Sequence, residues 1–227
     1  MVRTGHKASA GRAGKVVELH RPADTRDRVL AAAQTLFAEN GYRGTGLRDI
    51  ARKIGIRAPS LLHHFPSKEQ LYLAVLDRIF EGLEDSASMV LMGRNSHQDR
   101  MRRAITGAID YIAGRPDSMR IIWREMIEQS AISRQIFKRR IPPLFAMGVN
   151  FIFQGQRAGE FRPEVDPFHF LLSLNSITLG YFTTAAMVRR LWGQNLVEGD
   201  VIDRRKREVI DLVERTLFQA APAPDRN

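Results

Sequence analysis

Residues 25–76, TRDRVLAAAQTLFAENGYRGTGLRDIARKIGIRAPSLLHHFPSKEQLYLAVL, decide the fold of this chain. Apolar residues recur here at spacings of three and four, which places them on one face of successive helices. The first helix is predicted to begin at Thr25 and to end at Asn40 and Gly41, because both residues tolerate the left-handed backbone of a helix C-cap. No segment alternates apolar and polar residues as a half-buried strand does, so the sequence predicts an all-α fold.

Two short helices are predicted to follow the first. The apolar positions within 47–54 indicate one that is closed by a turn at Gly55. Pro59 marks the start of the other near Ala58, because the first turn of a helix has no internal acceptor for the N–H that proline lacks, and Pro66 ends it. Two short helices joined by a tight turn and braced by a preceding helix are what a reader of the DNA major groove requires.

A fourth helix opens on Ser67 and Gln70, which form the capping box S-x-x-Q, and it is predicted to run to about Leu91. Pro142 and Pro143 are expected either to start or to kink a later helix. Further helical patterns cover residues 99–113, 117–129, 131–157, 167–188 and 203–219.

The basic residues are concentrated at one end of the chain, whose formal net charge is +10. Residues 1–68 hold 13 Lys or Arg against 5 Asp or Glu, whereas residues 69–227 hold 22 against 20. We therefore expect the N-terminal end to meet a polyanion, with nucleic acid as the first candidate and an anionic membrane surface as the second.

Cysteine is absent, which excludes disulfides, thiolate metal sites and cysteine nucleophiles and suits a reducing cytosol. The first residues lack the apolar run of a secretory signal. One segment, 167–188, carries no Asp, Glu, Lys or Arg and is long enough to span a membrane. Because hydroxyl and amide side chains interrupt this segment, we expect a helix that is buried against other helices and does not span a membrane. The protein itself is expected to be cytoplasmic and nucleoid-associated, without membrane contact.

Residues 25–76 resemble the DNA-binding domain of the TetR family of transcriptional regulators. The resemblance implies a three-helix helix-turn-helix domain, joined by the fourth helix to a C-terminal helical domain that binds a ligand and dimerises. It rests on Phe37-Ala38, Asn40-Gly41-Tyr42, Thr45, Ile50-Ala51 and the run HHFPSKEQL at 63–71. The DNA-binding residues that it implies, mostly facing phosphates, are Thr45, Gly46, Arg48, Arg57, Ala58, Pro59, Ser60, Leu62, His63, His64 and Lys68.

Three positions depart from the family pattern. Gly46 and Arg57 stand where the family usually has Ser or Thr, and Leu62 stands where it usually has Tyr. The change at Leu62 removes one expected phosphate contact, whereas Arg57 adds a cation that reads guanine, holds a phosphate or is merely solvated. We expect the overall affinity to be kept and the specificity to differ.

The C-terminal half resembles the family only in architecture. The helices at about 167–188 and 203–219 have too much apolar surface for a monomer and are similar to the pair that forms a four-helix dimer interface in such proteins. The resemblance thus implies a homodimer on double-stranded operator DNA with an inverted repeat. It also implies a repressor that is released when a small-molecule effector, itself unknown, enters and shifts the fourth helix.

An apolar or aromatic effector is expected to bind among the helices between residues 99 and 182, where aromatic and Met side chains occur with a few amides. Each of these residues also fits an ordinary core position. The candidates are Trp123, Met126, Phe145, Met147, Asn150, Phe151, Gln154, Asn175, Thr178 and Tyr181.

The expected organisation is then a disordered basic arm over 1–23 and a DNA-binding domain over 24–84, with the helix-turn-helix at about 47–66. A ligand-binding and dimerisation domain over 85–220 and a tail over 221–227 complete it. Basic residues of the arm are expected to enter a minor groove, unless the arm is only a solubilising extension; they are Arg3, Lys7, Arg12 and Lys15.

Other classes of function fit less well. Adjacent His63 and His64 point about 100° apart on a helix and have no third ligand nearby, so we expect neither a metal nor a cofactor. No catalytic set indicates an enzyme, and Glu125 with Glu128 is expected to be a solvated helix face. The alternative is a basic adaptor that binds nucleic acid or membranes without sequence preference or effector control.

Overall fold

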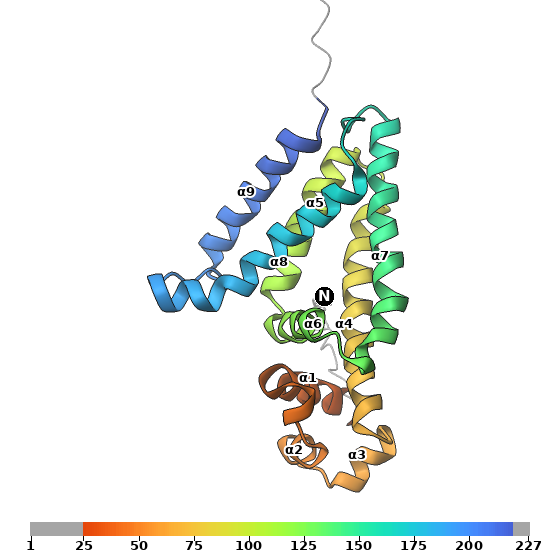
Figure 1. The fold of residues 1–227 in the computed structure, drawn as a ribbon, viewed down its shortest axis with the longest axis vertical. Helices are drawn as coiled ribbons and strands as arrows, with labels where there is room; N and C mark the ends of the chain where they lie inside the picture. Colours follow the sequence, from red (N-terminus) through yellow and green to blue (C-terminus); the bar gives the residue numbers. More distant parts are fainter. Residues whose placement is uncertain (1–24, 220–227) are drawn as a thin grey trace, which may run out of the picture.

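The computed structural model describes residues 25–219, and helices make up most of that range (Figure 1). The arm over 1–23, with Arg3, Lys7, Arg12 and Lys15, and the tail over 221–227 lie outside the described residues. The only extended pairing in the described range is an isolated bridge between Phe161 and Phe218, so the all-α prediction is confirmed. The helices are α1 (Thr25–Gly44), α2 (Leu47–Lys53), α3 (Ala58–His64), α4 (Lys68–Leu91), α5 (His97–Ala113), α6 (Pro116–Glu128), α7 (Ala131–Arg157), α8 (Pro167–Trp192) and α9 (Gly199–Leu217).

The ends of the first helices follow local signals in the sequence. The Ser67 hydroxyl accepts a hydrogen bond from the backbone N–H of Gln70 at 3.1 Å, which confirms the predicted cap of α4. Gly55 has a φ of +72°, as the turn between α2 and α3 requires. Gly41 also has a φ of +72°, so α1 kinks where its end was predicted and then continues to Gly44.

Two proline residues lie within a single helix, because α7 runs unbroken through Pro142 and Pro143. Both prolines are exposed, so the carbonyls that lose an N–H partner lie where water can reach them. A helix start at this point, one of the two expectations, is therefore excluded.

The apolar side chains form two cores. One core packs α1, α2, α3 and the first half of α4 together with Ile121 and Ile122 of α6 and Ile136 of α7. The other joins α5, α7 and α9 around Phe161. The helix-turn-helix unit thus shares its core with helices of the C-terminal half, and α4 runs from one to the other (Figure 1).

The long apolar helix α8 is not buried inside its own chain. It packs against α7 on one side, whereas α9 packs against α5, and the two helices diverge in Figure 1. In the described range α8 is the one helix long and apolar enough to span a membrane, yet only 6% of its apolar window is buried. The expectation of a buried helix is therefore wrong for the single chain, because one face of α8 packs against nothing within residues 25–219. Exposed apolar side chains on that helix include Phe168, Leu172, Met187, Leu191 and Trp192.

Candidate nucleic-acid interface and effector site

The helix-turn-helix geometry is set by a tight turn and an apolar anchor. The backbone N–H of Ile56 donates to the carbonyl of Ala51 at 3.0 Å, which folds the turn back onto α2. Leu61 on α3 is fully buried and fixes the rotation of that helix about its axis. The opposite face of α3 is therefore presented to solvent at one end of the molecule (Figure 1).

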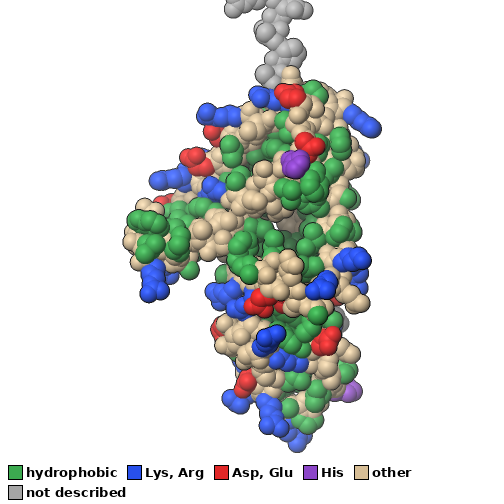
Figure 2. All heavy atoms as spheres, viewed as in Figure 1, with side chains coloured by type: hydrophobic (Ala, Val, Ile, Leu, Met, Phe, Trp, Pro, Cys, Tyr) green, Lys and Arg blue, Asp and Glu red, His purple; other side chains and the backbone are tan. Residues whose placement is uncertain are grey.

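Most of the expected DNA-binding residues lie on this open face. Arg57 and His63 are exposed, and Leu62 keeps 41% of its surface accessible. Figure 2 shows Lys and Arg side chains at this end of the molecule, where nucleic acid would approach. Of the remaining expected residues, Arg48, Pro59 and Ser60 are also exposed, and Gly46, Ala58, His64 and Lys68 are partly buried.

Thr45 does not fit the prediction that its side chain faces DNA. It is 3% exposed, and its hydroxyl lies within 2.8 Å of the Gly41 carbonyl and 3.0 Å of the Leu36 carbonyl. The side chain is drawn inward because α1 ends here and leaves carbonyls without helical partners. The expectation is wrong for this side chain, whose role in the structure is to close the end of α1.

Gly46 is the N-cap of α2 and offers no side-chain acceptor to the first turn. The carboxylate of Asp49 occupies the space beside it, since a Cβ at Gly46 would lie 2.8 Å from that oxygen. Asp49 also forms an exposed ion pair with Arg52 at 3.2 Å. The departure at Gly46 therefore leaves an acidic residue at the start of α2, where the helix dipole favours it.

Lys68 is the first residue of α4 and lies against the end of α1. Its ammonium is 4.5 Å from the centroid of the Tyr42 ring and donates to the carbonyl of Arg43 at 3.4 Å. Partial burial lowers the pKa of Lys68 from its ordinary value. The side chain is thus held in one position at the edge of the helix-turn-helix unit.

A buried polar cluster joins this unit to the C-terminal half. The hydroxyl of Tyr72 on α4 donates to Glu125 on α6 at 2.5 Å, and the hydroxyls of Ser130 and Ser133 donate to the other carboxylate oxygen. Glu125 is only 2% exposed, so its expected place on a solvated face is wrong, whereas Glu128 is exposed. A separation of three residues does place the two glutamates near one another on α6, but only the packing of the helices shows that Glu125 faces inward.

The neighbouring residue of α6, Arg124, binds the end of α1. Its guanidinium donates to the carbonyls of Phe37 at 2.9 Å and Ala38 at 3.3 Å. A Cβ at Gly41 would lie 2.9 Å from the same guanidinium, so the glycine leaves room for it. Arg124 was not among the predicted functional residues, because no local pattern reveals a contact across more than eighty residues.

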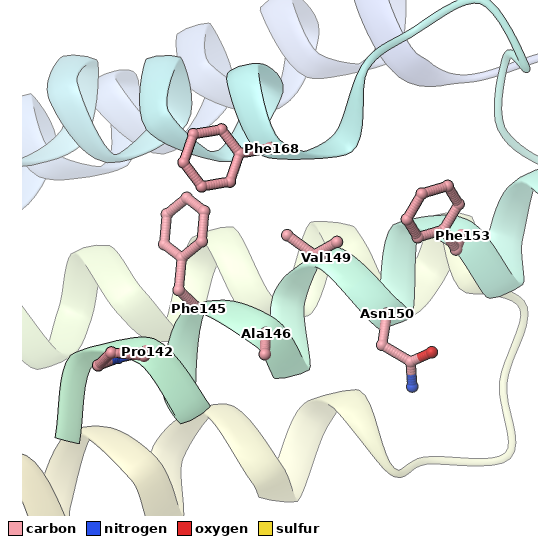
Figure 3. Close-up of a pocket in the computed structure, with 7 residues that line it drawn as sticks. All are labelled: Pro142, Phe145, Ala146, Val149, Asn150, Phe153 and Phe168. Carbon is pink, nitrogen blue, oxygen red and sulfur yellow. The ribbon is translucent and has the colours of Figure 1, made fainter. Parts of the chain in front are cut away.

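An apolar groove of about 390 Å³ lies between α7 and α8 (Figure 3). The rings of Phe145 and Phe168 meet edge to face there, with centroids 5.0 Å apart. Asn150 is the one polar residue of the lining, and its amide points away from Phe168 in Figure 3. Of the ten expected effector residues, the structure brings Phe145 and Asn150 together in this groove; its other lining residues are Pro142, Ala146, Val149 and Phe153.

The other expected effector residues do not share that groove. Phe151 is a core residue, 3% exposed, with Arg100 stacked on its ring, and Thr178 is buried. Trp123 and Met126 are exposed on α6. The expected effector residues point in different directions because successive side chains on a helix are rotated by about 100°, so neighbours in sequence do not share a face. Gln154 and Asn175 are exposed, Met147 accepts from the Ser88 hydroxyl, and the Tyr181 hydroxyl donates to the Leu196 carbonyl.

A second hollow, of about 420 Å³, lies between α8 and α9 and is lined mostly by apolar side chains such as Phe170, Ile177 and Leu212. It contains none of the ten expected residues. Among residues 25–219, no three His, Cys, Asp or Glu side chains lie close enough together to hold a metal ion.

Family models match both halves of the chain. Residues 29–75 match the model described as bacterial regulatory proteins, tetR family. Residues 98–213, more than half of the chain, match the model of the tetracyclin repressor-like C-terminal domain. The second match begins close to the first residue of α5.

Individual proteins give the same picture. The transcriptional repressor KstR2 of Mycolicibacterium smegmatis is 31% identical over 147 residues, which are 64% of this chain and 72% of that protein. The transcriptional activator FasR of the same organism is 30% identical over 135 residues, which are 59% of this chain and 61% of that protein.

Two solved structures have the same fold. A transcriptional regulator from Saccharomonospora viridis in complex with choline has a TM-score of 0.69 and 20% identity, and covers 88% of this chain and 100% of that one. AibR in complex with isovaleryl coenzyme A and operator DNA has a TM-score of 0.68 and 20% identity, and covers 82% of this chain and 96% of that one.

Proposed function

We propose, from the premise that this chain belongs to the TetR family of bacterial transcriptional regulators, that it is a repressor that binds an inverted-repeat operator as a homodimer and leaves it when a small apolar effector binds. Members of this family regulate transcription by binding DNA and are not enzymes. The observation that carries the proposal is the open face of α3, held by a buried Leu61 beside a basic surface.

The DNA contacts divide into two groups by position. Arg57, Ser60 and His63 lie exposed on or beside α3, where base edges in the major groove are within reach. Arg48 on α2 and Lys68 at the start of α4 flank that helix and suit phosphates on either side of the groove. Gly46, Ala58, Pro59, Leu62 and His64 complete the proposed interface, in which Thr45 acts only by shaping the end of α1.

Dimerisation is proposed through α8 and α9. Leu172 on α8 and Leu212 on α9 are 43% and 46% exposed, and the hollow between the two helices is apolar. A stable association requires a large apolar surface that is removed from water. The uncovered face of α8 supplies such a surface. A second copy that covers this face would account for its apolar side chains without a membrane.

The effector is proposed to bind the groove between α7 and α8, with Phe145 and Phe168 around its apolar part and Asn150 on a polar group. Trp123 and Met126 on α6 are proposed as further contacts. The solved regulators of the same fold hold choline and isovaleryl coenzyme A, so small organic effectors are known for this architecture. A ligand releases DNA only if it binds the DNA-incompetent state more tightly than the other.

Repression rather than activation is the proposed outcome. An operator-bound dimer obstructs the polymerase without any further partner, and KstR2 is a repressor. FasR, at nearly the same identity, is an activator, so a reporter fused to the selected operator decides between the two. Expression that rises when the gene for this protein is deleted supports repression, and expression that falls contradicts it.

Selection from random double-stranded DNA, followed by competition, tests the function as a whole. The expected product is an inverted repeat, from which excess cold operator displaces the protein far better than random DNA does, because specific affinity exceeds non-specific affinity by roughly a thousandfold or more. Equal displacement by both competitors would instead support the alternative, a basic adaptor without sequence preference. The protein is expected to act in the cytoplasm, at the nucleoid.

A further inference from the structure

Two consecutive residues of α6 hold two different helices of the DNA-binding unit. Arg124 binds the carbonyls of Phe37 and Ala38 at the end of α1, and Glu125 binds the hydroxyl of Tyr72 on α4. Neither contact lies on the DNA-facing surface or in the groove between α7 and α8. The two contacts lie where the helix-turn-helix unit meets the rest of the molecule (Figure 1).

The Arg124 contact is shaped to the end of α1. Regular helix is interrupted at the kink at Gly41, and the two donor groups of one guanidinium bind two carbonyls of the turn before that kink. Gly41 is needed for this fit, because its positive φ ends the regular helix and a Cβ there would crowd the guanidinium at 2.9 Å. The backbone of α1 is therefore held directly, without a flexible side chain on its own side.

The Glu125 contact is held in place by burial and by several hydrogen bonds. The carboxylate is 2% exposed and accepts from three hydroxyls, those of Tyr72, Ser130 and Ser133. Ser130 is the N-cap of α7 and Ser133 lies in its first turn. Two contacts within the C-terminal half therefore orient the carboxylate that accepts from Tyr72 on α4. A buried carboxylate that lost these partners would be strongly destabilised, which keeps the cluster intact.

We propose that Arg124 and Glu125 are positioning residues that set the tilt of the helix-turn-helix unit on the dimeric body, and thereby the half-site spacing that the protein accepts. The inference rests on the proposed dimer and inverted-repeat operator. In such a dimer the two recognition helices must lie about 34 Å apart, one turn of DNA. α3 lies beyond the junction formed by α1, α4 and α6, so a small tilt at that junction shifts α3 along the groove.

Other contacts across the junction are weaker restraints. The amide of Gln34 on α1 donates to the Ser118 hydroxyl on α6 at 3.1 Å, a single neutral bond. Arg139 and Arg140 on α7 pair with Asp77 of α4, but these groups are partly exposed and do not reach α1. Lys68 also donates to α1, at the carbonyl of Arg43, but it belongs to the start of α4 beside the helix-turn-helix. Among the side-chain hydrogen bonds of the described residues, those of Arg124 are the ones in which a charged group of α6 binds the backbone of α1.

Binding to a spacing series tests the proposal. Operators selected as above are remade with one or two base pairs added or removed at the centre, and affinities are measured for wild type and for Arg124→Met, which keeps the length of the side chain but not its donors. Wild type is expected to lose about tenfold or more on each changed operator. Arg124→Met is expected to bind the best operator several-fold more weakly and to discriminate among spacings by only about threefold.

Arg120→Met is the matched control, because Arg120 lies on the same helix with a 53% exposed side chain and makes only a long ion pair to Asp117. It should keep the spacing profile of wild type. If Arg124→Met does not fold, Tyr72→Phe tests the other contact and should flatten the profile less strongly. Equal weakening on every spacing would overturn the inference and leave the operator function intact. A wild type without spacing preference would overturn the dimeric operator function and this inference with it.

Discussion

The hydroxyl of Tyr72 on α4 donates a hydrogen bond to the carboxylate of Glu125 on α6, and both side chains are buried. Burial, followed by this hydrogen bond, raises the pKa of Tyr72 above its ordinary value. The phenol therefore remains a neutral donor to Glu125. The contact joins the helix-turn-helix unit to the C-terminal half through two side chains that are each 2% exposed.

Tyr72→Phe is expected to lower the free energy of unfolding by about 1–3 kcal/mol, because the carboxylate loses one partner and stays buried. Thermal unfolding followed by circular dichroism measures the change. Tyr42→Phe is the matched control, because the Tyr42 hydroxyl donates no hydrogen bond among the described residues, and it should be close to neutral. Equal losses in the two variants would show that the contact with Glu125 adds no stability.

The parts of the fold that were predicted correctly depend on neighbours in sequence. The cap of Ser67 on Gln70, the turn at Gly55 and the start of α3 near Pro59 are all decided within about four residues. The spacing of apolar residues by three and four likewise predicts which face of a helix is buried. The helix predicted at 131–157 has these same bounds in the structure, as α7. Local chemistry is therefore sufficient to place the helix-turn-helix.

The parts that were wrong depend on residues far apart in sequence. Thr45 was expected on the DNA face but turns inward, because the end of α1 offers it acceptors. Glu125 was expected in solvent but is buried, because Tyr72 lies 53 positions away and faces it. The composition of the helices between residues 99 and 182 suggested an effector site, yet only Phe145 and Asn150 of the ten expected residues share the groove between α7 and α8. Helix rotation and packing decide such questions, and a single sequence shows neither.

Lys68→Ala is expected to weaken binding to all DNA sequences alike and to lower the salt slope by about one unit, as the loss of one phosphate contact should. The ammonium already lies against Tyr42 and the Arg43 carbonyl, so little further ordering is needed when DNA binds. Affinity measured across a range of salt concentrations gives the slope. Lys138→Ala, an exposed lysine on α7, is the control. An unchanged slope for Lys68→Ala would remove Lys68 from the DNA interface.

Leu62→Tyr is expected to raise operator affinity by several-fold, because it restores a hydroxyl that can reach a phosphate from the exposed face of α3. The native leucine is expected to contact a thymine methyl instead, as apolar side chains in the major groove do. Replacing thymines by uracil one at a time should then weaken wild type by about threefold at one position in each half-site and leave Leu62→Ala unaffected there. Uniform tolerance of uracil by wild type would contradict this role.

Leu172→Lys is expected to give a monomer, because it places a charge on the uncovered apolar face of α8. Static light scattering at micromolar concentration measures the mass, for which wild type should give two chains. Met89→Lys is the control, since Met89 is 81% exposed on α4 and away from α8 and α9. A wild-type protein that is monomeric, or a Leu172→Lys protein that remains dimeric, would place the interface elsewhere.

Glu160 closes the end of the molecule farthest from the helix-turn-helix, and its ionisation makes that end sensitive to acid. Its carboxylate lies 2.7 Å from the His97 ring nitrogen and accepts from the backbone N–H of Gln98 at 3.1 Å. Burial alone would raise the pKa of Glu160, but these two hydrogen bonds outweigh it and the pKa is lowered. The unfolded chain therefore binds a proton more readily than the folded one, so the stabilisation is complete above the ordinary pKa of 4.5 and is lost as the pH falls through the lowered value.

Glu160→Gln is accordingly expected to cost about 1 kcal/mol of stability at neutral pH, discounted for the partial exposure of the pair. Urea unfolding at several pH values measures the difference in stability from wild type. This difference should shrink as the pH falls below about 4, because Glu160 of wild type is then protonated and as neutral as the glutamine of the variant. Glu164→Gln, an exposed carboxylate in the same connection between α7 and α8, should leave stability nearly unchanged throughout. A loss for Glu160→Gln that is as large at pH 3 as at pH 7 would show that packing, and not the charge of Glu160, secures this end of the fold.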